Sequence, residues 1–137
     1  MRRFSALLAG GLAAFLTVAV VIAQDAPPEE YVAAMTTIRT AMQTFNADEP
    51  DFEAIQAAGT EARAAFQYVQ TFWNDRDDTE AADLAATGAR EAASVVASAD
   101  LMSAEGVQFA AAAIGETCGA CHMAHRTRLE GGGFVIN

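Results

Sequence analysis

Residues 28–45, PEEYVAAMTTIRTAMQTF, carry the pattern that decides the fold. Their large apolar side chains recur in steps of four and three residues, at Tyr31, Met35, Ile38, Met42 and Phe45. On an α-helix this spacing places all of them on one face, where they form a continuous apolar seam. The two prolines at 27 and 28 favour a helix start, and the polar stretch 46–50 breaks the pattern. The stretch therefore predicts an amphipathic helix that ends near residue 45.

Two further stretches repeat this pattern at similar length. We expect a second helix to open at Pro50 and to run to Trp73, where the acidic stretch 74–78 ends it. Its seam positions are Phe52, Ile55, Gly59, Ala62, Phe66, Val69 and Trp73. Asp77, followed three residues later by Glu80, predicts a capping box at the start of a third helix. The inward positions of that third helix are small: Ala85, Gly88, Ala92, Val95 and Ala99.

A fourth helix is expected after Ser103, a natural N-cap, and should extend to about Glu130. The glycines at 131–133 would stop it and leave a short apolar tail. Four helices of about 20 residues, joined by short loops, place consecutive helices side by side in opposite directions. We therefore predict an all-α fold, an up-down-up-down antiparallel four-helix bundle.

Length and charge restrict the class of protein further. The chain has 137 residues, of which 8 are basic, all of them Arg, and 18 are acidic, for a net charge of −10. This length fits one domain. The acidic balance argues against nucleic-acid binding, because phosphate contacts need clustered Lys and Arg. Two cysteines are too few for a disulfide-stapled scaffold.

The first 23 residues have the layout of a secretory signal peptide. Arg2 and Arg3 precede an uncharged apolar run from Phe4 to Ile22, and Ala23 supplies a small residue for cleavage. An uncleaved membrane anchor is the alternative, because a run of roughly 20 apolar residues could just span a bilayer. Cleavage would leave one periplasmic domain, residues 24–137, without stable membrane insertion. That domain has six Arg and 18 acidic residues, a net charge of −12.

Both cysteines fall in Cys118-Gly-Ala-Cys121-His122, a C-x-x-C-H sequence typical of c-type haem attachment. On a helix these three side chains lie on one face. The two thiols could add to the two vinyl groups at one porphyrin edge, and His122 could offer a nitrogen to the iron as the proximal ligand. The pattern predicts one covalently attached haem c as the cofactor.

Three other interpretations of the thiols are weaker. A disulfide between Cys118 and Cys121 would close a tiny loop and would need no following His. A thioredoxin-like redox pair would need a βαβ context, and the chain shows no strand pattern. A zinc site would have only His125 to complete its four ligands. The export signal favours haem, because c-type attachment normally follows translocation.

From these residues the sequence resembles the class II c-type cytochromes, the cytochrome c′ family, whose attachment motif lies near the C-terminus of a four-helix bundle. The family pattern is C-x-x-C-H-x-x-aromatic-Arg, and here His125 stands at the aromatic position and Arg126 matches. The resemblance implies that Arg126 lies near the haem on its proximal side. It spans residues 24–137, although only the motif is specific.

Two further segments are similar to a less studied, low-spin branch of this group. They are Phe72-Trp73-x-x-Arg76 and His125-Arg126-x-x-Leu129. The chain also departs from the family: Val32 follows Tyr31 where members usually carry an Arg, and the Gly-rich C-terminal tail is extra. These departures bear on the haem propionate contacts and on dimerisation more than on the fold.

Met35 is the candidate distal iron ligand. Met35 and Met42 both lie on the first seam, and the resemblance places the distal residue early in that helix, at Met35 or, with a slip of one residue, at Thr36. A thioether suits haem iron and raises its potential. The alternative is that both methionines only fill the core. His125 is expected to lie on the surface or behind the ligands, because imidazoles three residues apart cannot bind opposite faces of one haem.

These features predict a periplasmic electron-transport protein rather than an enzyme. Its acidic surface should steer it to redox partners with basic docking patches, while homodimerisation is left open. The alternative is a five-coordinate haem protein that binds nitric oxide or carbon monoxide. A Met opposite His122 would favour the carrier, and a Leu or Phe there would favour gas binding.

Overall fold

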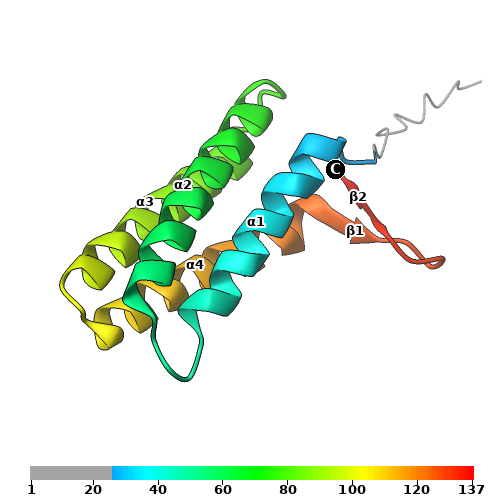
Figure 1. Ribbon diagram of the computed structural model, residues 1–137. Helices are drawn as coiled ribbons and strands as arrows, with labels where there is room; N and C mark the ends of the chain where they lie inside the picture. The colour runs from blue at the N-terminus through cyan, green and yellow to red at the C-terminus, as the bar shows by residue number, and fades with distance from the viewer. Residues whose placement is uncertain (1–25) are drawn as a thin grey trace, which may run out of the picture.

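The computed structural model describes residues 26–137, which form four α-helices and a short C-terminal β-hairpin (Figure 1). In chain order the elements are α1 (Glu29–Phe45), α2 (Phe52–Asn74), α3 (Thr79–Asp100), α4 (Ala104–His125), β1 (Arg126–Arg128) and β2 (Phe134–Ile136). The four predicted helices are confirmed, and their arrangement is compatible with a four-helix bundle. The expected signal peptide, residues 1–23, lies outside the described residues.

Side-chain caps begin three of the helices. Ser103 accepts a hydrogen bond from the Gly106 amide at 3.1 Å, which confirms it as the N-cap of α4. The third helix is capped by Asp78 rather than by the predicted Asp77, because Asp77 adopts a left-handed backbone conformation (φ 58°) outside the helix. The second helix begins at Phe52 rather than at Pro50, since its N-cap is Asp51.

The core forms where α2 packs along α3. All five small inward positions predicted for α3 are buried, as are the α2 seam positions from Ile55 to Trp73. Gly88 shows why small residues are needed: a Cβ atom there would lie 2.5 Å from Cε1 of the Phe66 ring. The small residues of α3 therefore make room for the large rings of α2.

The first and last helices contact each other little. α1 packs mainly on α2 and α4 mainly on α3. On the α1 seam, Tyr31, Ile38 and Phe45 are buried, whereas Met35 and Met42 are only partly buried. This separation leaves space between α1 and α4. None of the described helices is long and apolar enough to cross a membrane.

The C-terminal segment differs from the prediction. α4 ends at His125 instead of near Glu130, and Arg126–Arg128 pairs antiparallel with Phe134–Ile136. Gly132 and Gly133 adopt positive φ angles of 88° and 84°, which lets the chain reverse there. The Arg126 guanidinium carbon lies 3.1 Å from the centroid of the Phe134 ring, so a cation–π contact joins the two strands. The predicted tail is thus a strand in which Val135 and Ile136 are buried.

Candidate cofactor site

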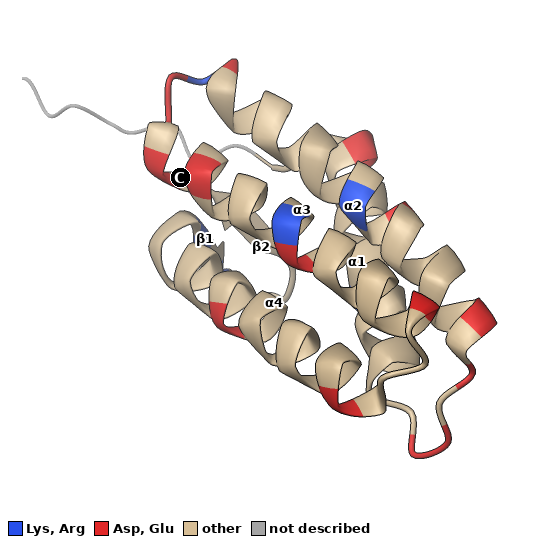
Figure 2. Ribbon diagram, turned by 90° about the vertical axis from the view of Figure 1, so that its left-hand side faces the viewer, with Lys and Arg blue, Asp and Glu red and all other residues tan. Residues whose placement is uncertain are grey.

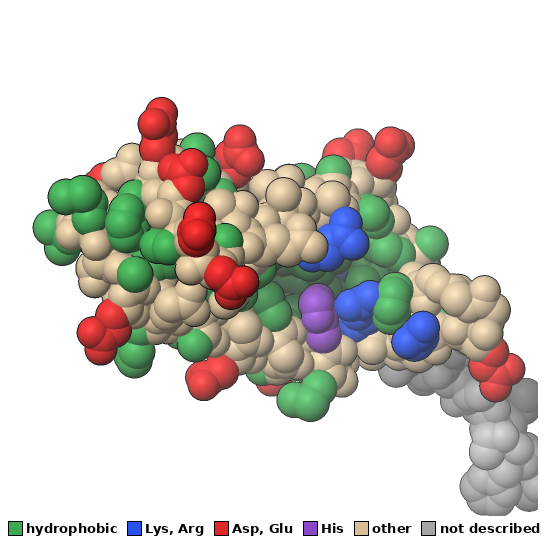
Figure 3. Space-filling model, turned by 60° about the horizontal axis from the view of Figure 1, so that its bottom comes forward, with side chains coloured by type: hydrophobic (Ala, Val, Ile, Leu, Met, Phe, Trp, Pro, Cys, Tyr) green, Lys and Arg blue, Asp and Glu red, His purple; other side chains and the backbone are tan. Residues whose placement is uncertain are grey.

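A pocket of about 480 Å³ lies between α1 and α4. Phe66 and Val69 of α2 and Leu84 and Ala85 of α3 also line it, and the hairpin contributes residues to its wall. Figure 3 shows the hollow, with a histidine and basic side chains at its border. Its size falls within the range of pockets that hold organic cofactors, about 300–1,000 Å³.

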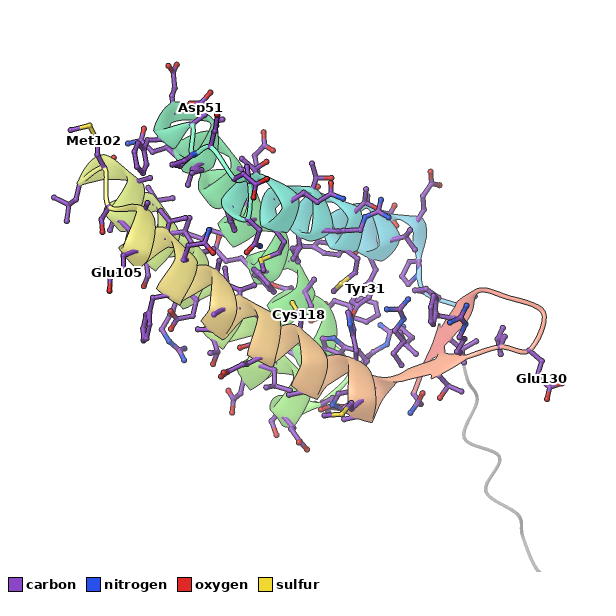
Figure 4. The ribbon with its side chains drawn as sticks, turned by 90° about the horizontal axis from the view of Figure 1, so that it is seen from below. Tyr31, Asp51, Met102, Glu105, Cys118 and Glu130 are labelled. Atoms are coloured by element: carbon purple, nitrogen blue, oxygen red, sulfur yellow. The ribbon has the colours of Figure 1, made fainter. Side chains whose placement is uncertain are left out.

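The C-x-x-C-H motif opens into this pocket. Cys118, Cys121 and His122 all line it, because their spacing puts them on the face of α4 that looks towards α1. Cys118 and the α1 residue Tyr31 point into the space between the two helices (Figure 4). The motif therefore faces a space large enough for a cofactor.

Both cysteines are free thiols and are partly buried. Burial raises the pKa of Cys121 to about 11, and the neighbouring Cys118 and Asp78 act in the same direction. Burial also raises the pKa of Cys118. At neutral pH both groups are therefore neutral thiols and not thiolates.

The surroundings of His122 favour its neutral form, although the residue is exposed. Burial lowers the pKa of its imidazole, and the positive charge of Arg126 lowers it further. The neutral ring keeps a free nitrogen lone pair, which is the form that coordinates iron. His122 lines the pocket, as its predicted role requires.

The structure brings both candidate methionines to the same pocket. Met35 and Met42 line it from α1, and so does Thr36, the neighbouring candidate for the distal position. Arg126, at the start of β1, also lines the pocket close to the motif. The five residues predicted for the site therefore all line this pocket: Met35, Cys118, Cys121, His122 and Arg126. Their roles there remain predictions.

His125 has surroundings that the sequence did not reveal. Its side chain is only 12% exposed, and its Nδ1 atom lies 3.3 Å from Oδ2 of Asp78. The imidazole packs on Trp73 with 5.1 Å between ring centroids. Among the described residues its Nε2 atom is buried without a hydrogen-bond partner, and the residue lines the pocket. The His125 side chain is therefore mostly buried in the pocket wall, against Trp73 and Asp78.

A hydrogen bond between two aromatic side chains supports this wall. Trp73 Nε1 donates to the Tyr31 hydroxyl at 3.2 Å. Burial raises the pKa of Tyr31 to about 12, so its phenol stays neutral. The sequence contained one signal of this cluster, the i, i+3 spacing of His122 and His125. The contacts of His125 with Asp78 and Trp73 join distant segments, which periodicity does not reveal.

Zinc binding gains no support from the geometry. Within residues 26–137, no three or more His, Cys, Asp and Glu side chains are grouped so as to hold a bare metal ion. Comparisons with protein-family models, with curated proteins and with solved structures each found no match. The family resemblance described above therefore rests on the quoted residues alone.

Proposed function

We propose that this protein is a periplasmic c-type cytochrome that carries one covalent haem and transfers electrons between redox partners. The observation that carries this proposal is that Cys118, Cys121 and His122 line one large pocket on a single face of α4. A disulfide or a dithiol redox pair would not need such a space beside it. A porphyrin needs a space of this kind, with both thiols at one edge and the imidazole next to them.

The residues that line the pocket fit a haem in chemistry as well as in size. Its walls are formed mainly by apolar side chains such as Ile38, Phe66 and Val69, which suit an apolar ring. The neutral thiols of Cys118 and Cys121 would each add S–H across a vinyl C=C bond, which gives a thioether without an oxidant. When bound, the haem supplies an iron that cycles between its ferrous and ferric states.

In this proposal the protein holds and shields the cofactor. His122 on α4 would supply a nitrogen ligand to the iron, and Met35 on α1 would supply a thioether ligand. The short loops between consecutive helices support an up-down-up-down antiparallel topology, in which α1 and α4 face each other across the pocket. The packed α2–α3 pair would exclude water from the inner edge of the ring.

The charge distribution supports docking to other proteins. Acidic residues occupy the first turn of every helix and the loops that follow α1 and α2 (Figure 2). Such a surface favours partners with basic docking patches, and association should slow as salt increases. An exported electron carrier with this surface needs no catalytic group of its own.

The absorption spectrum of the purified protein tests this function. Protein made together with a haem-attachment system should give, in alkaline pyridine, the spectrum of a haem with both vinyl groups saturated. The native reduced protein should show a six-coordinate spectrum that does not change with carbon monoxide. A five-coordinate spectrum that changes at once with carbon monoxide would instead support gas binding, and the absence of haem would contradict both functions.

A further inference from the structure

Arg39 brings a positive charge to the pocket without a carboxylate partner. It lies on the exposed side of α1, one helical turn after Met35, and both residues line the pocket. Among residues 26–137 the one contact between a carboxylate and a basic side chain joins Asp78 and His125, and the Arg39 side chain makes no hydrogen bond. The Arg39 guanidinium is thus available to a ligand.

The charged groups of the pocket wall have the opposite sign to the protein as a whole. The chain has 18 acidic and 8 basic residues, yet no Asp or Glu of the described chain lines the pocket. Its fully charged lining residues are Arg39 from α1 and Arg126 from β1. A wall that is apolar, with guanidinium groups and without carboxylates, suits an apolar ligand that carries anionic groups.

Each of the other arginines of the described chain either has a partner or lies outside the pocket wall. The Arg76 guanidinium carbon lies 3.8 Å from the centroid of the Phe72 ring, and Arg90 donates to the Thr87 hydroxyl at 2.8 Å. Arg126 stacks on Phe134 in the hairpin. Arg63 is exposed on α2 and does not line the pocket. Arg39 therefore combines a place in the pocket wall with an uncommitted guanidinium.

We propose that Arg39 binds a carboxylate of the pocket's ligand. In the proposed function that ligand is a haem, a porphyrin with two propionate carboxylates, and Arg39 anchors one of them. This inference rests on the proposed function. A guanidinium binds a carboxylate through two parallel hydrogen bonds, and its apolar stem lies along apolar surface. Arg126, from β1, also lines the pocket, where its guanidinium stacks on Phe134.

The anchor has an electrostatic consequence. A positive charge beside the porphyrin disfavours the ferric state, which carries one more positive charge than the ferrous state. Arg39 should therefore raise the midpoint potential. Removal of its charge should shift that potential to more negative values, and should weaken the hydrogen bonding of one propionate.

The first test uses the haem-loaded protein. Redox titrations of the wild type, Arg39→Gln, Arg39→Lys and the matched control Arg63→Gln are compared, together with the propionate bending bands in their resonance Raman spectra. We expect a more negative potential and a shifted propionate band in Arg39→Gln only, with most of the potential retained in Arg39→Lys. If Arg39→Gln and Arg63→Gln agree in both measurements, the proposal is overturned.

A second test is specific for carboxylates and does not involve iron. The Cys118→Ser, Cys121→Ser variant is titrated with metal-free mesoporphyrin and with its dimethyl ester, with helix content followed by circular dichroism. Adding Arg39→Gln should weaken binding of the dicarboxylate about tenfold and leave the ester unchanged. An equal effect on both ligands would overturn the anchor, whereas failure of both porphyrins to bind the pocket with Arg39 intact would count against the proposed function itself.

Discussion

The Oδ2 atom of Asp78 lies 3.3 Å from Nδ1 of His125, and this pair connects the start of α3 with the end of α4. The other carboxylate oxygen of Asp78 accepts the Ala81 amide at 3.0 Å and caps α3. One side chain thus fixes two elements at the pocket wall.

Replacement of Asp78 should therefore destabilise the protein. Asp78→Ala removes both the cap and the partner of His125, and should lower the free energy of unfolding by about 1–2 kcal/mol. Asp78→Asn keeps a capping oxygen and should cost less. Urea unfolding of the haem-loaded protein measures both, with the exposed Asp77→Asn as the control. Equal stability of Asp78→Ala and this control would show that neither the cap nor the contact with His125 stabilises the protein.

A methyl group at Gly88 should be harmful. The added Cβ atom would lie 2.5 Å from the buried Phe66 ring, and such overpacking costs about 1–3 kcal/mol. Gly119→Ala is the matched control, because an added Cβ there meets nothing within 4 Å and alanine favours the helix. Thermal melts should rank Gly88→Ala well below Gly119→Ala; the reverse order would mean that the α2–α3 packing is different.

The thiols of the haem-free protein should react slowly at neutral pH. The pKa of Cys121 is about 11, above the ordinary value of 9.0, because burial disfavours the thiolate. The alkylation rate at Cys121 should therefore keep rising as the pH increases from 9 towards 11, since the thiolate is the reactive form. Mass spectrometry after timed iodoacetamide pulses measures this rate. A plateau reached below pH 9 would contradict the burial of this group, and unfolded protein in urea provides the reference.

Met35 should determine the spin state of the haem-loaded protein. If its thioether binds the iron, the oxidised wild type is low-spin with a weak far-red charge-transfer band, and Met35→Ala is high-spin. Met42→Ala is the control, because Met42 lines the same pocket two helical turns further along α1. A wild type that is already high-spin would shift the assignment to gas binding, and loss of the band in Met42→Ala alone would assign the ligand to Met42.

Local patterns in the sequence predicted most of the helices but not the end of the chain. The seam from Tyr31 to Phe45 and the cap at Ser103 depend on neighbouring residues, so spacing alone revealed them. The hairpin depends on cross-strand pairing of Arg126 with Ile136 and on two glycines with positive φ, which a helical pattern cannot anticipate.

The sequence predicted the motif of the candidate site but not the whole pocket wall. The motif on α4 lies on one helix face, and its spacing fixed that face in advance. The role of Arg39 in the pocket was not predicted. Arg39 lies on the exposed side of α1, where a charged residue is ordinary and gives no sign of a binding site. Its position in the pocket wall depends on how far α1 lies from α4, a tertiary relationship that no single segment encodes.

The most direct test of the central claim, that a haem is bound covalently through Cys118 and Cys121, is the intact mass of the denatured protein made together with a haem-attachment system. We predict the mass of the chain plus one haem, retained after acid-acetone extraction and lost in the Cys118→Ser, Cys121→Ser variant. The mass of the chain alone, two hydrogens lighter through a Cys118–Cys121 disulfide, would contradict the account.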